Sequence, residues 1–152
     1  MEQAVELGNG APFLHGTLGF ALAMTGSSES ALESIGRAID LSPEDDFVTD
    51  WRSYEALAYF AAGDYEKARE AALKCVRSNA NSAFNRIADG YERLAASNAH
   101  LGRMDEARQA LQEAKRLRPG LRSQLVEAVF ASSDPDLRDR YLDGLRMAGL
   151  EE

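Results

Sequence analysis

The residues of this 152-residue chain that could carry out chemistry are few and lie far apart. His15 and His100 have no second ligand at a metal-binding spacing, so a zinc site is not supported. His15 is expected to be a packed or groove-lining side chain. Cys75 has no base near it in the sequence and is interpreted as a buried, unreactive thiol. We therefore expect no catalytic residue, no metal site and no cofactor, and the protein is not expected to be an enzyme.

The other polar patterns favour solvated surfaces over binding sites. Gly8–Gly10 lacks the strand and the following spacing of a phosphate loop and is interpreted as a turn. The acidic clusters are typical of helix starts and exposed helix faces; they are Glu44 to Asp46, and Glu66 with Glu70. Arginines and lysines gather between residues 103 and 122, but acidic residues interleave with them, which favours a solvated helix face over a phosphate site.

Composition places the chain among globular, non-membrane proteins. Hydrophobic residues make up 45% and charged residues 28%, and the formal net charge is -8. Such a charge disfavours nucleic acid and anionic membranes as partners. No apolar run approaches the roughly 20 residues of a membrane span. The N-terminus lacks the apolar core of a signal peptide. We expect one domain, residues 1–152, in the cytoplasm.

The elements that would position any site are helices, and the clearest pattern lies in residues 88–121. Small and large apolar residues alternate there at helical spacing on both sides of Gly102. Gly102 provides a left-handed position that can end the first helix, and Pro119 cannot continue the second. Ala95 and Ala107 are the small residues expected where the two backbones approach. On its own, this unit fits an ordinary helical hairpin as well as a repeat.

Recurrence decides between these alternatives. The same pattern fits residues 49–82 and residues 12–45, with Ala31, Ala68 and Ala107 in the same position, 37 and 39 residues apart. Together the three units resemble the tetratricopeptide repeat, whose period is about 34 residues. Short insertions are expected around residues 44–48 and 83–87. The resemblance implies an all-α solenoid of three helical hairpins.

The ends of the chain depart from the repeat pattern. Residues 1–8 match the second helix of a preceding repeat at three positions, and the alternative is a short native helix over Glu2 to Leu7. Residues 122–152 are expected to form two capping helices, because the outer face of a terminal repeat otherwise exposes apolar surface. The first should cover the open end of the third repeat. The second should start at Asp134 as N-cap with Pro135 at the first helical position.

The tail also resembles the closing segment of tetratricopeptide regions in bacterial signalling proteins, notably class III adenylate cyclases. The similarity rests on an Asp-Pro start and on Gly144, Leu145, Arg146, Ala148, Gly149 and Leu150. The cyclase catalytic domain is absent from this chain, so no catalytic residue is carried over.

The repeat resemblance implies a concave groove lined by the first helix of each hairpin. The groove positions and their neighbours include Phe13, Phe20, Met24, Asp50, Tyr54, Leu57, Phe60, Asp89, Glu92 and His100. One half is aromatic and the other acidic, which suits an amphipathic or basic helical segment. The lysine and asparagine clamp by which some family members hold a C-terminal carboxylate is missing.

These features predict a protein-interaction scaffold that binds a peptide or helix in its groove. The alternative is the regulatory region of a larger bacterial signalling enzyme or of a transcriptional regulator. The apolar groove residues are expected to be covered by a partner helix, by a second copy of the chain in a homodimer, or by the chain's own tail through Leu137, Tyr141 and Leu145. A homodimer through the solenoid end is also possible.

Overall fold

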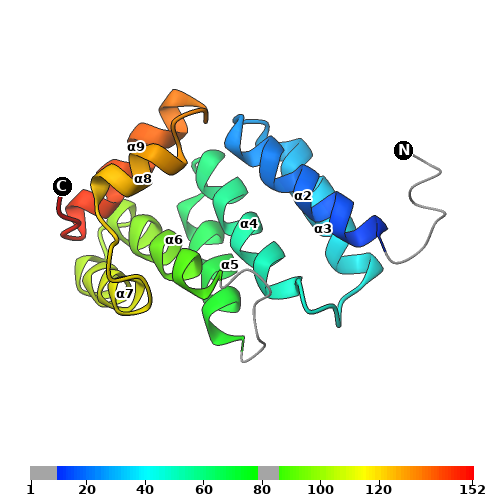
Figure 1. Ribbon diagram of the computed structural model, residues 1–152, viewed down its shortest axis with the longest axis horizontal. Helices are drawn as coiled ribbons and strands as arrows, with labels where there is room; N and C mark the ends of the chain where they lie inside the picture. The colour runs from blue at the N-terminus through cyan, green and yellow to red at the C-terminus, as the bar shows by residue number, and fades with distance from the viewer. Residues whose placement is uncertain (1–9, 79–85) are drawn as a thin grey trace.

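The structure is a computed structural model that describes residues 10–78 and 86–152. The described residues form eight α-helices and no strand (Figure 1). The helices are α2 (Ala11–Met24), α3 (Ser28–Leu41), α4 (Val48–Ala61), α5 (Tyr65–Arg77), α6 (Ile87–His100), α7 (Met104–Leu117), α8 (Ser123–Val129) and α9 (Pro135–Met147). The first six pair into three antiparallel hairpins that stack side by side. This arrangement confirms the predicted all-α solenoid.

The three hairpins turn at equivalent glycines. Gly26, Gly63 and Gly102 have φ angles of 83°, 79° and 78°, a left-handed conformation that glycine adopts without steric cost. After each glycine, the next backbone N–H donates to a carbonyl five residues earlier, as in a Schellman motif. One local sequence signal therefore ends the first helix of every hairpin.

Small residues set the close approach within and between hairpins. Ala31, Ala68 and Ala107 are fully buried. A Cβ added at Gly19 would lie 3.1 Å from the carbonyl oxygen of Ala31, so α2 and α3 meet nearly backbone to backbone. Gly16 lies against the ring of Trp51, which joins the first hairpin to the second. These positions explain why the sequence pattern depends on alanine and glycine.

The first helices of the hairpins, α2, α4 and α6, lie next to one another and form one side of the solenoid. Helices α3 and α5 fill the spaces behind them, since α3 packs on α4 and α5 packs on α6. The side formed by α2, α4 and α6 is the predicted groove.

The first of the two C-terminal helices was expected to cover the open end of the third repeat, and the tail was one of three candidates to cover the groove residues. In the structure α9 packs on α6 and, less extensively, on α4, and α8 packs on α9 (Figure 1). The α9 residues Leu137, Tyr141 and Leu145 recur every four positions and are fully buried. The groove offers an apolar surface that matches this face, which explains the placement. The predicted start of α9 is confirmed, because the Asp134 side chain accepts a hydrogen bond from the Leu137 N–H.

Two further expectations concern the N-terminal residues and membrane spans. The helix predicted for residues 1–8 lies outside the described residues. Among the described helices, none combines the length and the apolar character that crossing a bilayer requires.

Candidate functional site

All ten residues predicted to line or flank the groove lie on α2, α4 and α6. The structure brings some of them into contact. The rings of Phe20 and Tyr54 lie 4.8 Å apart, and those of Phe60 and His100 lie 5.5 Å apart. Phe13 is 38% exposed and its ring packs 5.1 Å from Phe47 at the edge of the solenoid. The predicted set therefore forms one face, but its members differ in accessibility.

Phe60 is the centre of an aromatic cluster that includes the C-terminal helix. Its ring lies 5.3 Å from Tyr141, 5.5 Å from His100 and 5.1 Å from Tyr65. Phe60 and Leu57 are both 0% exposed. The sequence offered a partner helix, a second copy of the chain or the chain's own tail as the cover of these groove residues. In the structure Tyr141 of the tail packs against Phe60.

Polar contacts fasten α9 to the end of α4. Arg140 donates from Nη1 to the carbonyl of Phe60 and from Nη2 to the carbonyl of Ala61, both at 2.9 Å. These carbonyls belong to the last turn of α4, which the helix cannot pair fully; the Phe60 carbonyl also accepts from the Gly63 N–H at 2.9 Å. Arg140 also donates to the hydroxyl of Tyr65 at 3.1 Å, and its own carbonyl lies 2.7 Å from Nε2 of His100. The cation at a helix C-terminus is favourable as well.

Gly144 allows α9 to touch the backbone of α6. A Cβ at this position would lie 2.9 Å from the carbonyl oxygen of Ala96 and 3.0 Å from its Cα. At those distances the backbone itself would have to shift. Together with Arg140, this contact fixes α9 at two points along its length.

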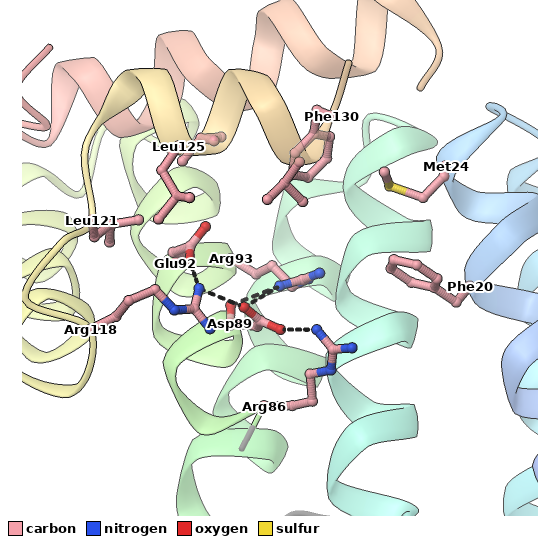
Figure 2. Close-up of a pocket in the computed structure, with 12 residues that line it drawn as sticks. Phe20, Met24, Arg86, Asp89, Glu92, Arg93, Arg118, Leu121, Leu125 and Phe130 are labelled. Carbon is pink, nitrogen blue, oxygen red and sulfur yellow. Dashed lines mark hydrogen bonds and ion pairs between the residues drawn. The ribbon is translucent and has the colours of Figure 1, made fainter. Parts of the chain in front are cut away.

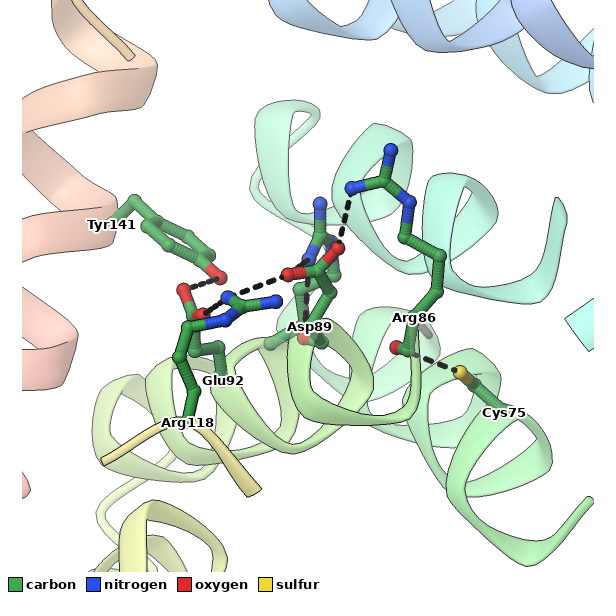
Figure 3. Close-up of polar contacts among 7 residues, drawn as sticks. Cys75, Arg86, Asp89, Glu92, Arg118 and Tyr141 are labelled. Carbon is green, nitrogen blue, oxygen red and sulfur yellow. Dashed lines mark hydrogen bonds and ion pairs between the residues drawn. The ribbon is translucent and has the colours of Figure 1, made fainter. Parts of the chain in front are cut away.

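The predicted acidic half of the groove is an internally paired cluster (Figure 3). Arg118 Nη1 lies 2.9 Å from Asp89 and 2.7 Å from Glu92, while Arg86 Nη1 lies 2.7 Å from the second oxygen of Asp89. Arg93 Nη1 donates to the backbone carbonyl of Asp89 at 3.1 Å. Asp89 and Glu92 are only 6% and 5% exposed. The expectation of an open acidic surface that selects basic partners is therefore corrected.

Asp50, the third predicted acidic groove residue, is fully buried in α4. It lies beneath the surface rather than on it, so it offers no accessible carboxylate to a partner. Burial raises the pKa of Tyr54 and of Cys75, and the negative charge of Asp50 adds a smaller increase to both.

The pKa values of the two carboxyl groups in this cluster shift in opposite directions. Burial, with repulsion from Asp89, raises the pKa of Glu92 to about 7, against the opposing effect of Arg93 and Arg118. Burial alone would raise the pKa of Asp89 too, but Arg93, Arg86 and Arg118 outweigh it and lower that pKa. Tyr141 donates its hydroxyl to Glu92 at 3.3 Å, which joins α9 to the cluster.

The described residues offer neither a cluster of metal ligands nor a reactive thiol for catalysis. Among them, no group of three or more His, Cys, Asp or Glu side chains is placed to hold a metal ion. Cys75 is fully buried, as predicted, and burial raises the pKa of its thiol to about 12. A thiol in that state is a poor nucleophile.

A pocket of about 200 Å³ remains beside α9, between α6, α8 and α2 (Figure 2). Sequence reasoning found Phe20, Met24, Asp89 and Glu92 in its wall but missed Arg93 on α6 and every wall residue outside the first helices. The missed residues are Arg86, Arg93, Arg118, Leu121, Leu125, Val126, Val129 and Phe130. The repeat pattern assigns groove positions only within a hairpin, so it gave no signal for a wall contributed by α8.

Comparison with known families supports the repeat interpretation. The tetratricopeptide repeat model matches residues 55–82 and residues 88–120, which correspond to the second and third predicted repeats. The first hairpin has the same helical arrangement but lies outside the match. A search of curated proteins gave no match. Over these two units the chain is similar to tetratricopeptide repeats, a fold that commonly mediates protein interactions.

Proposed function

We propose that this protein is a non-catalytic scaffold that binds an amphipathic helix of a partner protein in the groove formed by α2, α4 and α6. The observation that carries the proposal is that this groove already holds a helix, α9, by its apolar face. Leu137, Tyr141 and Leu145 are each fully buried there. Burying such side chains contributes on the order of 1.5–3 kcal/mol each, so the surface is suited to helices with this spacing.

A partner helix would bind by replacing α9. Because α9 is tethered to the third hairpin, its effective concentration at the groove is on the order of millimolar. A partner must therefore bind the emptied groove better than α9 does, and α9 sets the threshold for binding. A second copy of the chain could supply the helix, which would give a homodimer.

The test is a competition between α9 and a synthetic peptide of residues 132–150. The peptide carries a fluorescent label, and its anisotropy is measured against the wild-type chain and against Tyr141→Ala, which loosens the resident helix. Asp143→Ala is the matched control, since Asp143 is an exposed residue of the same helix. We expect tighter binding to Tyr141→Ala than to the wild type or the control. Circular dichroism establishes that each variant is folded.

Two results would count against the proposal. One is that the peptide fails to bind a folded Tyr141→Ala variant. The other is that a peptide with alanine at the three buried positions binds equally well. Light scattering of the full chain decides whether a second copy is the occupant.

The alternative function, a regulatory region of a larger signalling enzyme or transcriptional regulator, rests on the resemblance of the tail. The tail residues that carry it include Gly144, Leu145, Ala148 and Leu150, which pack in the interior of this chain. Because these residues pack in the interior, the resemblance to the tails of signalling proteins indicates a similar way of covering the groove and does not indicate a similar activity. The reading frame upstream of Met1 tests the alternative, which fails if no catalytic or DNA-binding domain is encoded there.

A further inference from the structure

The pocket beside α9 has two chemically different walls. The apolar wall comes from α8 and the segment before it, through Leu121, Leu125, Val126, Val129 and Phe130. Figure 2 shows Leu125 and Phe130 on one side of the space and Phe20 and Met24 of α2 on another. Val129 and Leu125 are 59% and 39% exposed, so this wall reaches the mouth of the pocket.

The opposite wall carries more cationic than anionic groups. It consists of three arginines and two carboxylates, namely Arg86, Arg93, Arg118, Asp89 and Glu92. Because burial raises the pKa of Glu92 to about 7, that carboxyl is partly neutral near physiological pH, and the excess of positive charge is then larger. Asp50 is not among the residues that line the pocket.

Arg118 keeps donor groups for a ligand. It makes its contacts with Asp89 and Glu92 through Nη1, although a guanidinium has donors on three nitrogens, and its side chain is 34% exposed. The Nε of Arg93 has no hydrogen-bond partner among the described residues, but that atom is itself buried and does not reach the pocket. An acceptor in the pocket that meets the remaining donors of Arg118 would form charge-assisted hydrogen bonds and be stabilised.

We propose that the pocket binds a small amphipathic carboxylate, with its carboxylate on the arginine wall and its apolar chain against α8, Phe20 and Met24. Guanidinium groups match the planar geometry of a carboxylate. A cation is repelled by the excess of arginines, and a purely apolar ligand would make no hydrogen bond to Arg118. The same chemistry occurs in a free short-chain acid and in the apolar C-terminal residue of a peptide.

This site shares Phe20, Met24, Asp89 and Glu92 with the helix-binding groove, but none of its lining residues belongs to α9. Its ligand occupies space that α9 leaves empty, so binding does not require α9 to move. The two proposals can therefore fail separately: the peptide of residues 132–150 tests the groove, and small molecules test the pocket.

The experiment compares ligands that differ only in the polar end. Hexanoate, hexan-1-ol and hexylamine are titrated into the full-length protein, and binding is followed by ¹H–¹⁵N chemical-shift changes. Hexanoate is expected to bind at least about tenfold more tightly than the alcohol, because charge-assisted hydrogen bonds are the strong ones. Hexylamine is expected not to bind. N-Acetylleucine, as a mimic of a peptide C-terminus, is compared with hexanoate, and the tighter of the two identifies the source.

Substitutions at the mouth of the pocket locate the site without disturbing the core. Val129→Glu places a negative charge at the mouth of the pocket, on the α8 wall that faces the arginines, and Val129→Gln is its neutral match at the same exposed position. We expect Val129→Glu to weaken hexanoate binding about tenfold or more relative to Val129→Gln. Equal binding of hexanoate and the alcohol, no binding of hexanoate, or equal affinity of the two variants would each overturn the proposal.

Discussion

Replacing Glu92 with glutamine is expected to remove a loss of stability that the wild-type protein shows as pH rises. The pKa of Glu92 rises from 4.5 to about 7 on folding, chiefly because the carboxyl is buried. One pKa unit corresponds to about 1.4 kcal/mol, so ionising this group costs the fold about 3 kcal/mol at most. Glutamine keeps the shape of the side chain and does not titrate.

The sign follows from the number of protons bound in each state. Between about pH 4.5 and 7 the folded protein holds a proton on Glu92 that the unfolded chain has released, so the free energy of unfolding falls as pH rises through this window. Asp89 affects stability in a lower pH range and with the opposite sign. Its pKa is lowered from 3.8, so its contribution is present above that value and is lost as pH falls below it.

Urea unfolding followed by circular dichroism at about pH 5 and about pH 8 measures the effect. The wild type should lose up to about 3 kcal/mol more than Glu92→Gln between these two pH values. Glu113→Gln is the control, because Glu113 pairs with Arg116 on an exposed helix face and should behave like the wild type. Parallel pH profiles for the wild type and Glu92→Gln would refute the reasoning.

Three further predictions concern the interior. Gly144→Ala should destabilise the protein by about 1–3 kcal/mol in urea unfolding, because the new methyl group meets the α6 backbone. Gly36→Ala is the control: Gly36 has open space around it in α3, and this variant should be more stable by about 0.5–1 kcal/mol. The reasoning fails if both variants change stability alike. Arg140→Gln should lower the free energy of unfolding by about 1–3 kcal/mol and speed amide exchange in α9. Arg138→Gln loses only a surface contact with its neighbour and should change neither quantity. Equal exchange in the two variants would contradict the role of Arg140 in holding α9. Cys75 should react with a thiol reagent only after unfolding, measured by absorbance, and rapid labelling of the native protein would disprove its burial.

The hairpins were predictable from the sequence because their signals are local. Gly26, Gly63 and Gly102 supply the same left-handed turn in each unit. Ala31 and its equivalents mark where two helices of one hairpin meet. Each of these features involves residues within one repeat period, so a pattern with a fixed spacing is enough to find them.

The state of the groove was not predictable in this way, because it depends on contacts between distant parts of the chain. Phe60 is buried by Tyr141, which lies far along the sequence and belongs to no repeat. Glu92 is paired by Arg118, which lies at the end of α7. A repeat pattern identifies which side chains face the groove but not what covers or neutralises them.

The contact between Asp134 and the first hairpin changes how this solenoid should respond to unfolding. In most repeat proteins each unit touches only its neighbours, so the ends can fray one unit at a time. Here the backbone N–H of Asp134 donates to the carbonyl of Met24 at 2.8 Å, while α9 packs on α4 and α6. α9 together with its N-cap residue thus touches all three hairpins and makes each of them depend on the others. The array becomes a closed cooperative unit, with the higher contact order and slower folding that long-range closure brings.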